Sequence, residues 1–277
     1  MALSFSVNTN PGAFTALQAL NGTNRDLTEV QNRINTGLKV AGAKDDSAIF
    51  AIAQNLRSDL GGLNAIKQSL DRASGALDVG IAAAEAISDL LIEAQEKALA
   101  ASDPSFDAAS RTALQNDYQA IINQIDDVVA QAEFNGTNIV NSARTNAISA
   151  LVSDDGSQTI DVDGVDLNTA AGALSLTVTT FGTASAASAA LAQVDSALTT
   201  VNATLATFGS AARQIELQGT FADRLSDTIE TGIGNLVDAD LARESARLQS
   251  LQVKQQLGLQ ALSIANQAPA AVLSLFG

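Results

Sequence analysis

Apolar residues recur at alternating spacings of four and three residues at both ends of this chain. Near the N-terminus the positions are Ala13, Leu17, Leu20, Asn24, Leu27, Gln31, Ile34 and Leu38, of which Asn24 and Gln31 are polar. Near the C-terminus they are Leu241, Glu244, Leu248, Leu251, Gln255, Gly258, Leu262, Ala265, Val272 and Phe276, of which Glu244 and Gln255 are polar. Such spacing gathers a stripe on one face of a helix. It predicts one helix from about Pro11 to Thr36 and another that begins after Asp238–Asp240.

The outermost parts of both terminal helices also lack charge on their other faces. No Asp, Glu, Lys or Arg precedes Arg25, and none follows Lys254. A helix that packs on one side only normally carries charged residues on its opposite face. We therefore expect these ends to be surrounded by neighbours on several sides, as assembly elements are.

Three further helices are predicted between the ends. Residues 47–101 carry one long stripe, with Asp45–Ser47 as its N-cap and Ser102–Ser105 as its end. A second helix is expected over 107–131, and a third from Ser188 to about Gly232–Gly234. Helices of this length are typical of a rod rather than a globule.

Within residues 140–187 the apolar and polar residues alternate with a period of two, which is typical of strands. The alternation is clearest at Thr159–Asp163 and at Leu174–Thr179. The predicted fold is thus mainly α: a long-helix rod or coiled coil formed by the N- and C-terminal segments, with a small β-hairpin insert. The chain should run out along the rod and return, with the insert at the turnaround and the termini together.

Composition excludes several function classes. The net charge is −15 and Lys and Arg do not cluster, which disfavours nucleic acid and an anionic membrane as partners. The absence of His and Cys removes the commonest general base, thiol nucleophiles and the usual transition-metal ligands. No cleavable signal peptide or transmembrane stretch is visible. We expect no enzyme, no cofactor and no membrane insertion.

Two acidic clusters could suggest a metal site. The run from Asp161 to Asp166 has some calcium-loop character, but the position where an EF-hand needs an acidic residue is Gly172. Asp45 and Asp46 could form an acid pair or a metal site. A turn and a helix cap are the simpler interpretations.

Three segments resemble the bacterial flagellins. The run NLVDADLARESARLQSLQVKQQLGLQALSIANQAP at 235–269, followed by VLSLF at 272–276, is similar to their C-terminal signature. The segments RINTGLKVAGAKDDSA at 33–48 and FNGT at 134–137 resemble the loop between their first two helices and a later turn. The short insert and the segment from Ala98 to Asp103 look like alphaproteobacterial members. The resemblance spans the chain except about 140–187.

This resemblance implies a subunit of the hollow helical filament used for swimming, exported unfolded by the flagellar type III apparatus. Residues 1–42 and 235–277 would form the inner filament core, 43–139 and 188–234 the helical rod, and 140–187 a surface-exposed insert. The implied partners are further copies of the chain, other flagellins, an export chaperone, the filament cap and hook-associated junction proteins. The expected subunit-interface residues are Leu17, Leu20, Leu27, Ile34, Leu248, Leu251, Leu262, Ala265, Val272 and Phe276.

Two positions depart from the flagellins that Toll-like receptor 5 senses. Those proteins carry an arginine where this chain has Gln95. They also carry a basic residue at a nearby position where this chain has Glu93. The resemblance therefore implies weak receptor recognition. The Ser/Thr-rich insert is a candidate for O-glycosylation, with plain hairpin chemistry as the alternative. A hook–filament junction protein and a non-flagellar helical surface protein remain alternative functions.

Overall fold

The computed structural model describes residues 9–141 and 147–273, with side chains as far as residue 267. The chain forms two compact units. The terminal unit comprises Met1–Ser58 and Thr228–Gly277, and the central unit comprises Asp59–Asp227. Two long helices contribute residues to both units, and each unit is described here by itself.

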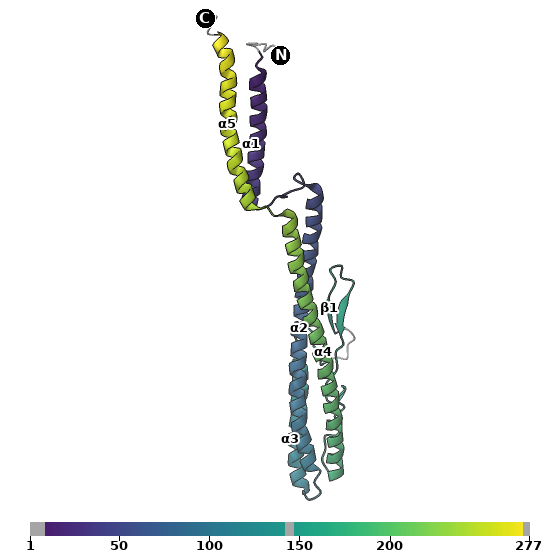
Figure 1. Cartoon of the computed structure of the whole chain (residues 1–277). Coiled ribbons are helices and arrows are strands. Elements are labelled where there is room, and N and C mark those ends of the chain that lie inside the picture. Colours follow the sequence, from purple (N-terminus) through teal and green to yellow (C-terminus); the bar gives the residue numbers. More distant parts are fainter. Residues whose placement is uncertain (1–8, 142–146, 274–277) are drawn as a thin grey trace. The chain divides into compact units, whose positions relative to one another are not determined.

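The terminal unit is built on two antiparallel helices, α1 (Pro11–Thr36) and α5 (Leu241–Leu273), which lie side by side (Figure 1). Helix α1 begins where the Asn10 side chain accepts a hydrogen bond from the Ala13 N–H, with proline in its first turn. It ends at Gly37, whose φ of 73° is a left-handed conformation that glycine adopts without strain. The sequence predicted both boundaries, and they are confirmed.

The two segments that link these helices to the rest of the chain pair with each other. The Lys39 N–H donates to the Val237 carbonyl at 2.7 Å, and the Ala239 N–H donates to the Gly37 carbonyl at 2.8 Å. Beside this pairing Val40, Ala53 and Val237 form a small buried cluster. Hydrogen bonds and apolar contacts therefore fix the start of α5 to the end of α1.

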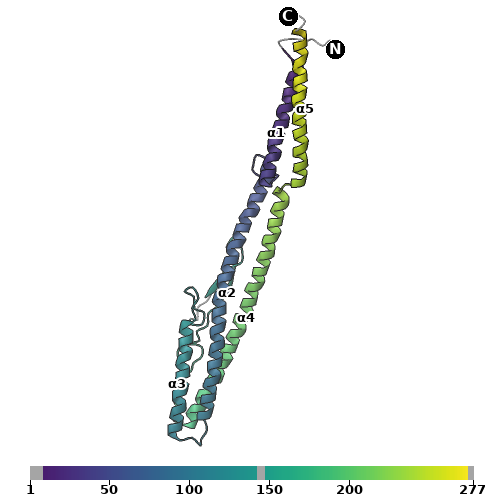
Figure 2. The ribbon, with the colours of Figure 1, turned by 90° about the vertical axis from the view of Figure 1, so that its left-hand side faces the viewer.

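The central unit contains the larger parts of α2 (Ser47–Ala101) and α4 (Ala184–Val237), together with α3 (Ala108–Gln131). The three helices lie alongside one another in both views (Figures 1 and 2). Their facing stripes are buried, with Leu77, Ile87 and Leu91 on α2 fully enclosed. The part of α2 that belongs to the terminal unit is less covered, since Ile52 is 51% exposed.

The described part of the insert contains one antiparallel hairpin, β1 (Ile148–Leu151) and β2 (Thr159–Val162), in which Ile148 lies opposite Val162. The strand predicted at Thr159 is confirmed in position. The strand predicted over 174–179 is wrong. Leu174 and Leu176 are buried alternately, as in a strand, but the Leu176 N–H donates to a loop carbonyl and the Val178 N–H donates to the Gln193 side chain.

Two further expectations need correction. The hairpin does not lie at the turnaround, because the Leu151 N–H donates to Ser69 Oγ and Asp154 contacts Gly62, both well before the end of α2. Helix α4 also begins earlier than expected and continues through Gly232 and Gly234 to Val237. Glycine lowers helix propensity by only about 1 kcal/mol, which packing can offset.

Candidate assembly surface

The predicted interface residues of the two ends mostly line the seam between α1 and α5 of the same chain. Leu20 and Leu251 are buried in the single chain, and Leu20 approaches Gly258 across the seam. Half-buried positions at the same helical period are Leu27, Ile34, Leu248, Leu262 and Ala265. The ladders read from the sequence thus describe an intrachain helix pair.

Polar side chains fix the register of this seam. The Gln255 amide donates to the Asn24 side chain at 2.8 Å, and the Asn10 amide donates to the Ala265 carbonyl at 2.7 Å. The half-buried pair of Gln255 and Asn24 favours one register over its alternatives, because a shift would leave both amides unpaired. Both bonds lie within one chain, so they set the register of the intrachain helix pair.

An ion pair closes the other end of the seam. Arg33 Nη1 lies 3.3 Å from Glu244 Oε1, and Arg33 also binds the exposed Glu29 at 2.5 Å. Arg33 lies in the last turn of α1 and Glu244 in the first turn of α5, so each charge complements its own helix dipole. Glu244 is 8% exposed, and its second carboxylate oxygen has no partner in the described part of the chain.

A second set of apolar side chains on α5 points away from the seam. Val253, Leu257 and Ile264 are 55%, 58% and 67% exposed. Their spacings of four and seven residues place them on one face, and the angle of about 100° per residue places that face opposite Leu251. We call Val253, Leu257 and Ile264 the outer face of α5. The single chain leaves it uncovered.

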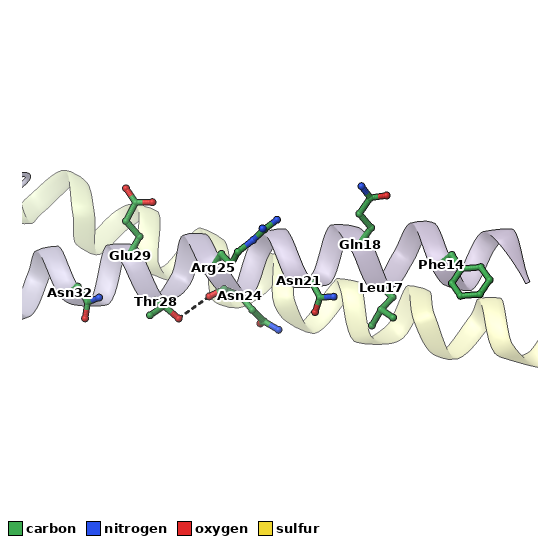
Figure 3. A pocket seen from close by; sticks show the side chains of 9 residues that line it. All are labelled: Phe14, Leu17, Gln18, Asn21, Asn24, Arg25, Thr28, Glu29 and Asn32. Atoms are coloured by element: carbon green, nitrogen blue, oxygen red, sulfur yellow. Dashed lines mark hydrogen bonds between the residues drawn. The ribbon is translucent and has the colours of Figure 1, made fainter. Parts of the chain in front are cut away.

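Helix α1 carries an uncovered flank of its own. A shallow groove of about 870 Å³ runs along it, lined at one end by Phe14 and Leu17, which are 65% and 43% exposed. Figure 3 shows Gln18, Arg25 and Glu29 along one edge of this groove. Its other lining residues are Asn21, Asn24, Thr28 and Asn32. A groove lined by amide groups and by one aromatic and one aliphatic side chain suits contact with a protein better than binding of a charged ligand.

Sequence reasoning found part of this surface and missed the rest. Leu17 was expected at an interface and is exposed in the single chain. The Val272 side chain and Phe276 lie outside the described residues. Phe14 and the outer face of α5 were missed, although a second heptad-like spacing at 253, 257 and 264 was a usable signal.

The two positions linked to receptor recognition lie on α2 in the central unit. Glu93 is exposed. Gln95 is half-buried, and its amide donates to Asp195 Oδ1 on α4 at 2.5 Å. Gln95 therefore also contributes to packing between two helices.

The acidic clusters have structural roles. Asp46 caps α2 by accepting from the Ala48 and Ile49 N–H groups, and Asp45 accepts from the Ala41 and Gly42 N–H groups. Asp161 lies in β2 and accepts from Ser149. Across the described residues, no group of three or more acidic side chains could hold a metal ion. In the same residues, no helix has the length and apolar content needed to cross a membrane.

Comparison with known proteins identifies the family. The bacterial flagellin N-terminal helical region matches residues 7–145, and the C-terminal helical region matches residues 191–276. Flagellin FljK of Caulobacter vibrioides is 48% identical over the whole of both chains. A flagellin of Brucella melitensis is 34% identical over 98% of this chain and 99% of its own.

A solved structure supports the fold. A hook-associated protein from Vibrio parahaemolyticus, described as putative, superposes with a TM-score of 0.59 at 12% identity and covers 70% of this chain and all of its own. At that identity the likeness concerns the fold alone. The relatives that match over their whole length are named flagellins, which disfavours the junction-protein alternative. The chain belongs to the bacterial flagellins of the alphaproteobacterial type, and it is a structural subunit of the extracellular flagellar filament.

Proposed function

We propose that the outer face of α5 and the exposed flank of α1 join this subunit to further copies of itself in the inner core of the filament. The observation that carries the proposal is the exposure of Val253, Leu257 and Ile264 opposite an already complete seam. Exposed apolar side chains gathered on one face commonly mark a protein interface. A homopolymer would cover this face on every subunit.

The free energy gained by covering the outer face of α5 suits a surface that makes repeated contacts in a polymer. Complete burial of a Leu, Ile or Val side chain contributes about 1.5–3 kcal/mol, so covering one that is half-exposed contributes on the order of 1 kcal/mol. Three such side chains do not hold two molecules together against the loss of free motion. They stabilise a polymer in which each subunit has several neighbours.

The domain plan follows from this assignment. Residues 1–42 and 235–277 would form the inner core, residues 43–139 and 188–234 the helical rod, and residues 140–187 the part of the surface that faces solvent. The insert is rich in Ser and Thr, which makes it our candidate for O-glycosylation. An intact mass equal to the sequence mass would remove that idea.

The partners before and during assembly are also proposed. An export chaperone would cover the C-terminal helix, whose apolar side chains face more than one direction and need a partner in the monomer. The cap and hook-associated junction proteins would contact the same ends at the two limits of the filament. Other flagellins with similar ends would enter the same polymer. The monomer would travel unfolded, since helices without partners are marginal in water.

We also propose that this flagellin is poorly recognised by Toll-like receptor 5. Gln95 bonds to Asp195, and Glu93 presents a negative charge where sensed flagellins have basic residues. The test is a receptor-reporter assay with the wild-type chain and with Gln95→Arg. A wild-type response comparable to that of an enterobacterial flagellin would contradict the proposal.

Seeded polymerisation with electron microscopy tests the assembly surface. The informative variant is Leu257→Gln with Ile264→Gln, because both side chains are exposed in the single chain and the change leaves the seam intact. Gln252→Ala, an exposed position on another side of α5, is the control. We expect hollow filaments from the wild type and the control, and none from the double variant or from a chain lacking residues 255–277.

Filaments of normal length from the double variant would show that the outer face is not an interface. A wild-type chain that stays a folded monomer under all seeding conditions would contradict polymerisation itself.

A further inference from the structure

A small pocket of about 150 Å³ lies within the central unit, away from the assembly surface. Three segments far apart in the sequence line it: α2 with Ser69 and Arg72, the turn after α3 with Asn135 and Thr137, and the start of β1. A cavity of about 150 Å³ is enough for a molecule the size of benzene. The pocket can therefore hold a small ligand together with water.

Ser69 is the most enclosed polar side chain of this pocket. It is 6% exposed, and its oxygen accepts a hydrogen bond from the Leu151 N–H at 3.1 Å. Its hydroxyl hydrogen has no acceptor among the described residues. The Ser149 hydroxyl, in the same pocket, differs because it donates to Asp161 at 2.7 Å. A serine hydroxyl can donate one hydrogen bond as well as accept, so Ser69 has a donor left for a ligand.

The other polar side chains of the pocket are donors without an acceptor. In the described part of the chain, the side chains of Arg72, Asn135 and Thr137 form no hydrogen bond and no ion pair. A guanidinium offers five N–H groups, an amide two and a hydroxyl one. The guanidinium also carries a permanent positive charge, and its planar fork matches the paired oxygens of a phosphate or carboxylate. The pocket thus offers donors and one cation.

The turn that supplies two of these donors is fixed in place. Phe134 and Thr137 exchange two backbone hydrogen bonds of 2.9 Å, and the residues between them, Asn135 and Gly136, have φ values of 49° and 79°. This is the geometry of a tight two-residue hairpin turn. The Phe134 ring packs on Gly75 of α2, where an added Cβ would lie 2.8 Å from the ring. Donors that are already held in position lose little freedom when a ligand binds.

We infer that this pocket binds a small oxyanion of about phosphate size, held by the Arg72 guanidinium and by the Ser69, Asn135 and Thr137 side chains. The inference goes beyond filament assembly and does not depend on it. Phosphate and carboxylates share the chemistry that these donors recognise. Phosphate has four oxygens to meet donors that come from two different segments, whereas a carboxylate has two, so phosphate is the better fit.

The charge around the pocket limits the affinity. The chain has a net charge of −15, and the exposed acids Asp71 and Glu133 are sequence neighbours of pocket residues. Their repulsion opposes the attraction of Arg72 for an anion. Because the ligand has only a few atoms, we expect a Kd of about 1 mM.

A titration of the full-length monomer tests the inference. Inorganic phosphate and sodium acetate are added separately at neutral pH, with chloride keeping the ionic strength constant. Binding is followed through the backbone amide resonances of residues 134–137 and through the heat released in calorimetry. The variants are Arg72→Gln and Thr137→Val. The matched control is Arg57→Gln, which removes the same charge from α2 in the terminal unit. Circular dichroism checks the fold of each variant.

We expect phosphate to shift the resonances of residues 134–137 in a saturable way, and acetate to bind the same residues more weakly. Arg72→Gln should weaken binding by about tenfold and Thr137→Val by about threefold, while Arg57→Gln should match the wild type. Acetate binding tighter than phosphate would assign the same donors to a carboxylate. Shifts that do not saturate, or that Arg72→Gln and Arg57→Gln reduce equally, would overturn the inference, because general screening of charge would then explain them. The monomer assay leaves the proposed filament function untouched by either result.

Discussion

The same substitution at two glycines of α2 should have opposite effects on stability. Gly61 and Gly80 both lie within the helix and within the central unit. A Cβ at Gly61 would have no heavy atom within 4 Å, whereas a Cβ at Gly80 would lie 2.3 Å from Cδ1 and 2.5 Å from Cγ1 of Ile139. The change to alanine therefore isolates helix propensity at one position and adds a collision at the other.

The magnitudes follow from these distances. Alanine is better than glycine in a helix interior by about 0.8–1 kcal/mol. Gly61→Ala should gain most of that amount. At Gly80 the same gain opposes the cost of displacing Ile139, which is 1% exposed and cannot swing into solvent. Overpacking of this kind costs about 1–3 kcal/mol, so Gly80→Ala should be destabilising by about 1 kcal/mol.

Urea denaturation of the monomer, followed by circular dichroism, measures both variants against the wild type. The two should differ by about 2 kcal/mol in the free energy of unfolding, a separation that clears the usual uncertainty of extrapolation. A Gly80→Ala variant as stable as Gly61→Ala would refute the reasoning, because it would mean that the side chain of Ile139 yields without cost. A shifted Ile139 methyl resonance in Gly80→Ala alone would locate the collision.

Three further results are expected. Tyr118, the only tyrosine, is buried against Phe181, and burial raises its pKa to about 12. The stability of the monomer should therefore hold below pH 10 and fall as pH rises from there toward 12. In an alkaline titration the phenolate absorbance should appear at a higher pH than for a free tyrosine. Because its hydroxyl has no hydrogen-bond partner among the described residues, Tyr118→Phe should be neutral or stabilising by up to about 1 kcal/mol in urea melts and should remove that alkaline loss. Asp107 caps α3 by accepting from the Ser110 N–H, and hydrogen bonds from the Ser110 side chain and N–H lower the pKa of Asp107 from its ordinary value. Asp107→Asn should weaken stability at pH 7 and flatten its decline as pH falls below about 4, followed by acid titration of helix content. Arg33→Ala would leave the buried Glu244 carboxylate unpaired and should lower the thermal depolymerisation temperature of filaments by far more than the control Glu29→Gln.

The helices could be predicted from the sequence because their signals are local. Asn10 and Asp46 accept hydrogen bonds from the N–H groups of the first turn, Gly37 supplies the left-handed end, and the apolar period carries the interior. A local signal does not depend on what packs against it. The start of α4 was placed late, because Thr183 caps the helix through its hydroxyl in a stretch of small residues with little apolar contrast.

The insert could not be predicted to the same degree, because its backbone partners are remote in sequence. Leu174 and Leu176 alternate as in a strand, but the neighbouring N–H groups bond to Thr169 and to Gln193 on α4. Period two records which side chains are buried, not whether a second strand is present. The position of the hairpin on α2 likewise depends on Ser69, which carries no signal of its own.

For the candidate interface too, apolar periodicity identified which residues are buried but not what buries them. The apolar ladders contain Leu20 and Leu251, and the resemblance to flagellins implied that these residues lie at subunit interfaces. A stripe alone does not reveal whether its partner belongs to the same chain. The structure satisfies that stripe with the α1–α5 seam. The apolar side chains left for a neighbouring subunit are those of a second, weaker helical spacing on α5, Val253, Leu257 and Ile264. An assembly surface is therefore better sought among the apolar residues that stay exposed once those buried within the chain are left out. In this flagellin such residues lie on both the terminal and the central unit.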